Sequence, residues 1–299
     1  MLDLENETKR RKTMRHGGTL LLCFAIASVA TAEEIKHRWV CVDNGANRLI
    51  HVDQNDTSKN WSIAIPVGSR DLQSLGDGKL LVSHGSGAVE YRLADGKRLP
   101  WGVDRYESIQ TARRLPDGNT LLATVSGTLY EVDPQGKEIG KKQIAVKGLN
   151  MRLMRVLPSG NLLIGSAGPK AAIEVSRDGK VVKSLPLPDK GYTAIRLDDG
   201  RTMATSGGEA RIVTLDRDGN ILSHVGGKTD HPKLGLDFCS GWDRLPSGHC
   251  VMANWLGHGK QGTAPHLIEF STDNKIVWTW EDHEMARQVT NVLMLDGVK

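Results

Sequence analysis

The sequence has few aromatic residues and little net charge. Of 299 residues, 5% are aromatic, and 39 Lys and Arg stand against 35 Asp and Glu, which leaves a net charge of +4. Contacts to a phosphate backbone need clustered Lys and Arg, so this weak and scattered charge excludes a dedicated nucleic-acid binder. A hydrophobic fraction of 39% beside 25% charged residues indicates a folded chain rather than a disordered one.

The sequence also lacks a hydrophobic run of the roughly 20 residues that a membrane-spanning helix needs. The apolar stretch at residues 19–30 is shorter, follows a basic segment at residues 9–15, and ends in Ala30-Thr31-Ala32. This layout is typical of a secretory signal peptide. We therefore expect residues 1–32 to be a signal peptide, and residues 33–299 to be a periplasmic or extracellular protein with no membrane span.

Two details of this segment stay open. Met14 is an alternative start, because the signal has a more usual form from that residue. A lipid anchor on Cys23 is disfavoured because Leu22 occupies the position where a small residue is expected. The first 32 residues hold five positive and three negative charges, so the remainder carries +2 rather than +4.

Cysteine is scarce as well. Beyond the expected signal peptide only Cys41, Cys239 and Cys250 remain, so at most one intramolecular disulfide can form. An exported protein permits such a bridge, but free cysteine is also among the most buried residue types. The sequence leaves both interpretations open.

What the chain does have is an internal repeat. A turn of the form Leu-x-(Asp/Ser)-Gly, followed by a β-rich run, recurs with intervals of 40 to 49 residues between its glycines, except that the last copy is shortened to Leu-Asp-Gly. These glycines are Gly78, Gly118, Gly160, Gly200, Gly248 and Gly297. A second turn recurs half a unit later, at residues 95–97, 135–137, 178–180, 218–220 and 273–275. Short alternating runs lie between the turns, so each unit contains four strands, which we name A to D.

A four-stranded repeat of this length predicts the blade of a β-propeller, a ring of sheets around a central channel. Residues 38–43, 48–53 and 61–65 have the patterns of strands B, C and D without an A strand, and residues 289–295 form a lone A strand. Pairing the two ends completes one blade and removes exposed sheet edges. We therefore predict an all-β, six-bladed β-propeller as a single domain over residues 33–299.

The phrases Arg113-Arg-Leu-Pro-Asp-Gly-Asn-Thr-Leu-Leu-Ala-Thr124 and Asp243-Arg-Leu-Pro-Ser-Gly-His resemble blades of bacterial propellers in the arylsulfotransferase-like and pyrroloquinoline-quinone-like superfamily. In arylsulfotransferases a histidine in the channel accepts the sulfuryl group, so the resemblance implies a histidine at the same place in this chain. Here the residues that open the A strands include Arg70, Gln110, Arg152, Tyr192, Ser240 and Thr290 but no histidine, so that activity is not expected. The quinone-binding proteins of this superfamily are larger, eight-bladed rings. We therefore expect this six-bladed chain to bind no quinone and no other cofactor.

The D–A and B–C connections vary in sequence and share one face of the ring, where binding residues usually lie. The longest B–C connection, residues 255–266, is rich in Gly and His. Aromatic faces beside cationic groups would suit a sugar or a small anion. The candidate ligand-binding residues at the channel mouth are Arg70, His84, Tyr106, Arg152, Tyr192, Trp255, His258, His266, His283 and Arg287. The spacing of the histidines matches no zinc pattern, so we expect no metal.

Two function classes follow from these residues. We favour a monomeric protein that binds a small ligand or a protein partner through this face without catalysis, because no acid, base or nucleophile has a recognisable spacing. The alternative is an extracytoplasmic hydrolase, lyase or transferase whose unidentified catalytic residues meet only in space. Convergence of at least three of six side chains within hydrogen-bond reach around one cavity would favour the enzyme. Those six are Arg70, Arg152, Tyr192, His258, His283 and Arg287.

Overall fold

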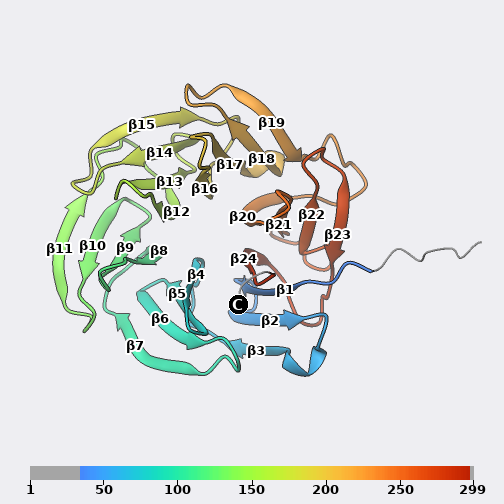
Figure 1. Cartoon of the computed structure of the whole chain (residues 1–299), viewed down its shortest axis with the longest axis horizontal. Coiled ribbons are helices and arrows are strands. Elements are labelled where there is room, and N and C mark those ends of the chain that lie inside the picture. Colours follow the sequence, from blue (N-terminus) through green and yellow to red (C-terminus); the bar gives the residue numbers. More distant parts are fainter. Residues whose placement is uncertain (1–33, 297–299) are drawn as a thin grey trace, which may run out of the picture. The chain divides into compact units, whose positions relative to one another are not determined.

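The computed structural model describes residues 34–296, and within this range the chain is all-β. Six four-stranded antiparallel sheets stand around a common centre as the blades of a β-propeller (Figure 1). The described residues contain no α-helix, only the two 3-10 turns Thr57–Lys59 and Gly207–Glu209. The predicted six-bladed fold is confirmed. The expected signal peptide and Gly297 lie outside the described residues.

Each blade consists of strands A to D from the centre outward. Blade 1 consists of β24 (Val289–Met294), β1 (Arg38–Asp43), β2 (Arg48–Asp53) and β3 (Trp61–Ala64). Blade 2 consists of β4 (Leu72–Gly76), β5 (Lys79–His84), β6 (Gly87–Arg92) and β7 (Arg98–Asp104). Blade 3 consists of β8 (Ile109–Arg114), β9 (Thr120–Thr124), β10 (Thr128–Val132) and β11 (Glu138–Gln143).

The second half of the ring repeats this order. Blade 4 consists of β12 (Met151–Val156), β13 (Leu162–Ser166), β14 (Ala171–Val175) and β15 (Val181–Pro186). Blade 5 consists of β16 (Ala194–Arg196), β17 (Thr202–Ser206), β18 (Arg211–Leu215) and β19 (Ile221–Gly226). Blade 6 consists of β20 (Phe238–Arg244), β21 (Cys250–Trp255), β22 (Leu267–Phe270) and β23 (Ile276–Trp280).

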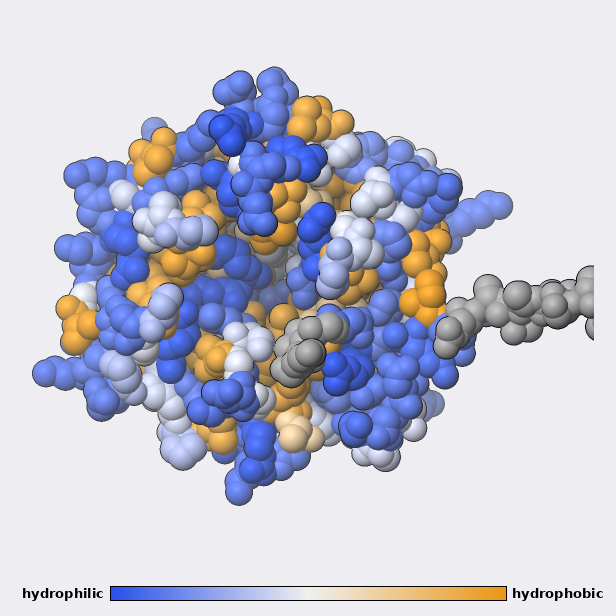
Figure 2. All heavy atoms as spheres, viewed as in Figure 1, coloured by the Kyte–Doolittle hydropathy of each residue, from blue (hydrophilic) through white to orange (hydrophobic). Residues whose placement is uncertain are grey.

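Burial follows the position of a strand within its blade. All five residues of β9 and of β13 are buried, because the B strands lie inside the sheet and pack against neighbouring blades. The outermost strand β11 has no buried residue, as expected for a strand that contains Glu138, Lys141 and Lys142. Hydrophilic residues cover most of the face drawn in Figure 2, which is hollowed near its centre.

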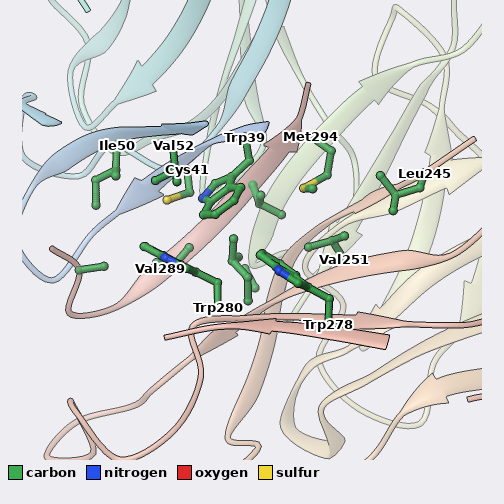
Figure 3. Close-up of a cluster of buried hydrophobic side chains, with 14 residues drawn as sticks. Trp39, Cys41, Ile50, Val52, Leu245, Val251, Trp278, Trp280, Val289 and Met294 are labelled. Atoms are coloured by element: carbon green, nitrogen blue, oxygen red, sulfur yellow. The ribbon is translucent and has the colours of Figure 1, made fainter. Parts of the chain in front are cut away.

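The two ends of the propeller meet in blade 1. Strand β24 pairs antiparallel with β1, with Val40 opposite Leu293 and Cys41 opposite Val292. The indole of Trp39 on β1 lies edge-on to both Trp278 and Trp280 of β23, with ring centres 5.2 Å apart in each case (Figure 3). The predicted closure by the C-terminal strand is confirmed, and a buried aromatic cluster joins blade 1 to blade 6.

The repeated turns require glycine because their backbone is left-handed. Gly118 and Gly160 have φ of 88° and 84°, a region that residues with a Cβ atom rarely adopt. Each glycine closes its turn by donating its N–H to the carbonyl of the leucine three residues earlier, Leu115 and Leu157. The recurrent glycines of the sequence are therefore a requirement of the A–B turns.

Cys41, Cys239 and Cys250 are buried and free. Burial raises the pKa of each thiol, so all three are protonated at neutral pH. They pack as small apolar side chains in the clusters between blades. Within residues 34–296, no helix has the length and apolar character needed to cross a membrane.

Candidate functional site

A cavity of about 390 Å³ opens at the channel mouth, on the face of the D–A and B–C connections. Blades 1, 2, 4, 5 and 6 all contribute to it. Its lining residues are Asn44, Arg70, Arg152, Ala167, Lys190, Tyr192, Phe238, Ser240, Trp255, His258 and Thr290. Pockets of 300 to 1,000 Å³ typically hold small organic ligands, so we treat this cavity, the mouth cavity, as the candidate site.

Three cations line the mouth cavity and no acid does. Arg70 precedes β4, Arg152 lies on β12, and Lys190 lies in the connection from β15 to β16. Among residues 34–296, none of the three forms an ion pair with a carboxylate. Burial lowers the pKa of Arg152, and the nearby positive charge of Arg70 lowers it further. The mouth cavity therefore concentrates positive charge that the protein does not neutralise.

Aromatic rings form another part of the wall. The rings of Tyr192 and Phe238 meet edge to face with centres 6.2 Å apart, and Phe238 meets Trp255 in the same way at 6.2 Å. His258 continues the row, 5.3 Å from Trp255. The guanidinium carbon of Arg152 lies 5.8 Å from the centre of the Tyr192 ring, where a cation is attracted by the ring's π electrons.

Two polar groups of this aromatic wall have no partner within the described chain. The hydroxyl of Tyr192 and the indole N–H of Trp255 are both buried and form no hydrogen bond there. Buried polar groups are nearly always hydrogen-bonded, and these two are among ten buried side-chain atoms of the described residues that have no partner. Both groups can donate a hydrogen bond.

The backbone around Tyr192 is held on both sides. Its N–H donates to the Thr205 hydroxyl at 2.6 Å, and its carbonyl accepts from the N–H of Leu153 at 2.9 Å. The preceding Gly191 has no room for a side chain, since a Cβ atom there would lie 2.9 Å from the carbonyl oxygen of Ala171. The ring is therefore presented from a rigid segment.

The loop that carries His258 is tied down by Asp237. The carboxylate of Asp237 accepts from the N–H of Gly257 at 2.7 Å and from Nζ of Lys260 at 2.6 Å. Burial works against ionisation of Asp237, but these hydrogen bonds outweigh it and lower its pKa. Asp237 immediately precedes Phe238, so one carboxylate positions both the loop and the inner strand at the mouth cavity.

A buried ion network lies next to the mouth cavity along the inner strands. Asp71 follows Arg70 in the chain, accepts from Nη2 of Arg113 at 2.6 Å, and also bonds to Thr111. Nη1 of Arg155 and the amide of Asn291 each lie 3.3 Å from Asp71 Oδ1. Four blades thus meet at one carboxylate, which fixes the frame on which the mouth cavity is built.

A second cavity, of about 640 Å³, lies among the A–B turns of blades 3 and 4. It is larger and contains four arginines, but each has a carboxylate partner within the protein. The pairs are Arg113 with Asp71, Arg155 with Asp71, Arg114 with Glu90, and Arg177 with Glu131. Asp71 serves two of these arginines, and Asp117 also lines the cavity, so four carboxylates stand against its four arginines. This cavity therefore offers less to an anion than the mouth cavity does.

The structure brings together five of the ten candidate residues, namely Arg70, Arg152, Tyr192, Trp255 and His258. His283 and Arg287 line a separate cavity of about 450 Å³ between blades 6 and 1. His266 is fully buried, and its Nε2 lies 3.1 Å from Nδ1 of His283. The other ring nitrogen of His283, Nε2, lies 2.9 Å from Oε1 of Glu281. These three residues share the face but not the mouth cavity.

The remaining two candidates lie in the core. The ring of Tyr106 stacks on that of Tyr130 with centres 4.2 Å apart, and its hydroxyl donates to Glu138 at 2.9 Å. Tyr106 thus ties the connection between blades 2 and 3 to strands β10 and β11 of blade 3. His84 is 1% exposed at the end of β5, and its Nδ1 lies 3.3 Å from the Ser86 hydroxyl. Within residues 34–296, no group of His, Cys, Asp and Glu side chains has a geometry that could hold a metal ion.

Lys190, Phe238 and Asn44 line the mouth cavity but were not among the residues predicted from the sequence. Ser240, not Phe238, is the blade equivalent of Arg152, because each stands five residues before the leucine of its A–B turn, Leu245 or Leu157. Repeat position therefore gave no signal for Phe238. Ser240 and Thr290 were recognised as channel-facing and line the mouth cavity, but they were not among the ten candidates.

No protein-family model matches the chain. A protein of unknown function from Bacteroides caccae superposes with a TM-score of 0.73 over 87% of this chain and 99% of that chain, at 22% identity. A streptogramin B lyase gives a TM-score of 0.58 at 12% identity, covering 82% of this chain and 80% of the lyase. A chain of a nidogen/laminin complex gives 0.61 at 13% identity, covering 87% and 98%. At these identities the comparisons establish that the chain has the β-propeller fold.

Proposed function

We propose that this protein binds a small anionic molecule in the mouth cavity. The observation that carries the proposal is the contrast in charge pairing. Arg70, Arg152 and Lys190 line one cavity without a carboxylate partner in the described chain, whereas the arginines of the larger cavity are all paired. Holding unpaired like charges together costs free energy, which a bound anion would offset.

The site fits a ligand better than it fits a reaction. Four of the six side chains named for an enzyme, Arg70, Arg152, Tyr192 and His258, line the mouth cavity, which exceeds the three required. Among the described residues no hydrogen bond joins any two of these side chains, so the further condition of hydrogen-bond reach is not shown. An extracytoplasmic hydrolase, lyase or transferase is the second candidate, because an imidazole ring, that of His258, lines the same cavity. Mass spectrometry of candidate ligands after incubation separates the two: unaltered ligand supports binding, and a product that His258→Gln no longer forms supports the enzyme.

We further propose that the propeller acts outside the cytoplasm, since residues 1–32 have the layout of a signal peptide. The A–B turn phrases of its blades favour a place in the arylsulfotransferase-like and pyrroloquinoline-quinone-like propellers. Neither proposal rests on the mouth cavity. N-terminal sequencing of the exported protein tests the first, with Glu33 expected as the new N-terminus.

A thermal-shift experiment tests anion binding. The probes are phosphate, acetate and phenylacetate, with 2-phenylethanol as a neutral comparison, at low ionic strength because salt screens the cations. A ligand present at 100 times its dissociation constant stabilises the native state by about 2.7 kcal/mol. At least one anion should raise the melting temperature of the wild type but not of Arg152→Met or Arg70→Met, whereas the exposed Arg201→Met should behave as wild type. No shift with any anion, or a shift that survives both cavity substitutions, would contradict the proposal.

A further inference from the structure

We propose that the ligand of the mouth cavity is an aromatic carboxylate, held with its acidic group between Arg70 and Arg152 and its ring against Phe238 and Trp255. This inference rests on the proposed anion binding and narrows it to one chemical class. Three properties of the wall carry it: its size, the balance of its hydrogen-bond donors and acceptors, and the order of its aromatic rings.

The size of the mouth cavity exceeds what an inorganic anion needs. A volume of about 390 Å³ lies in the range that encloses small organic molecules. A bare phosphate would fill only part of it and would leave Phe238 and Trp255 facing water. An anion with an apolar body would use both the cations and the aromatic surface, and burial of that body adds free energy in proportion to its apolar area.

The charged groups of the wall are all hydrogen-bond donors. Two guanidinium groups and one ammonium group can donate hydrogen bonds but cannot accept them. The Asn44 amide nitrogen already donates to the Ser69 carbonyl, at 3.5 Å, and the Thr290 hydroxyl to the Val42 carbonyl, at 3.2 Å, so these two side chains keep neutral oxygens that can accept. Sugar hydroxyls need acceptors as well as donors, and no carboxylate lines the mouth cavity. A carboxylate, which only accepts, matches this wall better than a neutral sugar does.

The aromatic rings form a continuous row rather than isolated contacts. Tyr192, Phe238 and Trp255 follow one another edge to face, and His258 ends the row. Aromatic pairs gain free energy from edge-to-face or offset stacking beyond the area that they bury. Arg152 lies over the ring of Tyr192, so the cationic and the aromatic parts of the wall meet at these two residues. A carboxylate attached to a ring within a few bonds spans this junction.

Titration calorimetry with matched probes tests the inference. The probes are phenylacetate, acetate and cyclohexylacetate, which share the carboxylate and differ in the attached group. Phenylacetate should bind the wild type at least tenfold more tightly than acetate and at least threefold more tightly than cyclohexylacetate. Phe238→Leu and Trp255→Leu should each weaken phenylacetate at least fivefold and leave acetate within twofold. Trp101→Leu, on the outer strand β7 and remote from the mouth cavity, is the matched control and should change neither.

Each result separates this inference from the proposed function. If acetate or cyclohexylacetate binds as tightly as phenylacetate, or if both leucine variants retain wild-type affinity for phenylacetate, the aromatic class is overturned while anion binding stands. If no carboxylate or phosphate binds, both proposals fail. Circular dichroism and thermal unfolding show whether a leucine variant is folded, and either variant alone suffices for the test.

Discussion

Arg113 donates from Nη2 to Oδ1 of Asp71 at 2.6 Å, and both side chains are buried between blades 2 and 3. The Nε and Nη1 groups of Arg113 donate to the carbonyls of Met154 and Leu72, so the guanidinium also reaches blade 4. Burial lowers the pKa of Arg113 to about 9, and the neighbouring Arg155 lowers it as well, although Asp71 opposes both effects. The pair therefore joins three blades at the cost of desolvating a charge.

Removing one partner of this pair should be costly. We expect Asp71→Ala to lower the free energy of unfolding by about 3–5 kcal/mol, because Arg113 would keep a buried charge without its carboxylate. Arg201→Met breaks the exposed pair with Asp199 and should change stability by less than about 1 kcal/mol. Urea unfolding of both variants measures the difference. Equal effects would show that the Asp71 network does not stabilise the ring.

Arg70 should behave in the opposite way. It adjoins Asp71 in the chain, yet it forms no ion pair within the described residues and repels Arg152. Arg70→Met should therefore leave the unliganded protein within about 0.5 kcal/mol of wild type, or make it more stable, as expected where function is gained at the expense of stability. Urea unfolding without added anions checks this. A loss above about 2 kcal/mol would mean that Arg70 serves the fold.

Gly160 offers a test of backbone strain without steric conflict. Its φ is 84°, but a Cβ atom there would meet nothing within 4 Å, so only the left-handed conformation opposes a side chain. Gly160→Val should destabilise the protein by about 1–3 kcal/mol. Gly140→Ala is the control, because Gly140 lacks a positive φ and a Cβ atom would make an ordinary 3.5 Å contact with Glu131. Thermal unfolding should separate the two variants, and equal melting temperatures would count against strain at the A–B turns.

His37 joins the beginning of the propeller to its last described residue, Asp296. We expect this contact to make the free energy of unfolding depend on pH. Burial alone would lower the pKa of His37, but hydrogen bonds to Asp296 at 2.5 Å and Glu269 at 2.8 Å, with the charges of both, raise it to about 9. A raised pKa means that the folded state binds the proton more tightly than the unfolded state. The contribution of His37 is therefore complete below pH 6.5, declines between pH 6.5 and 9, and is lost above that range.

Urea unfolding at pH 6.5 and pH 9.5 measures this contribution. We expect wild type to lose on the order of 1–3 kcal/mol over the interval, since each unit of pKa shift corresponds to about 1.4 kcal/mol. His37→Gln should lose most of this dependence because it carries no titrating proton. A variant with the same pH dependence as wild type would show that other groups cause it.

The fold could be predicted from sequence because the blade repeats its chemistry. The turn glycines recur at left-handed positions, and each repeat includes strands that place apolar residues inside. The chain closure followed from the same regularity, since residues 289–295 had the pattern of an A strand and residues 38–65 lacked one. Each of these signals is local in sequence, and the register of neighbouring strands follows from the turns.

The candidate site was harder to predict because it is assembled from residues of five blades that are far apart in the sequence. Arg70, Arg152 and Tyr192 could be selected by their place near the start of an A strand. His84 at the end of a B strand and Tyr106 in a D–A connection were chosen because they lie on the loop face, but both side chains are buried, which depends on packing between blades. The unpaired state of the arginines also depends on which carboxylates lie nearby in space, and the distance between residues along the chain does not reveal it.

The most direct test of anion binding in the mouth cavity is calorimetric titration of phenylacetate into wild type, the double variant Arg70→Met/Arg152→Met, and Arg201→Met. We predict saturable binding to wild type and Arg201→Met, and at least a hundredfold weaker binding to the double variant, because two charge-assisted contacts are lost. Equal affinity in all three proteins would place the anion elsewhere and contradict the account of the site.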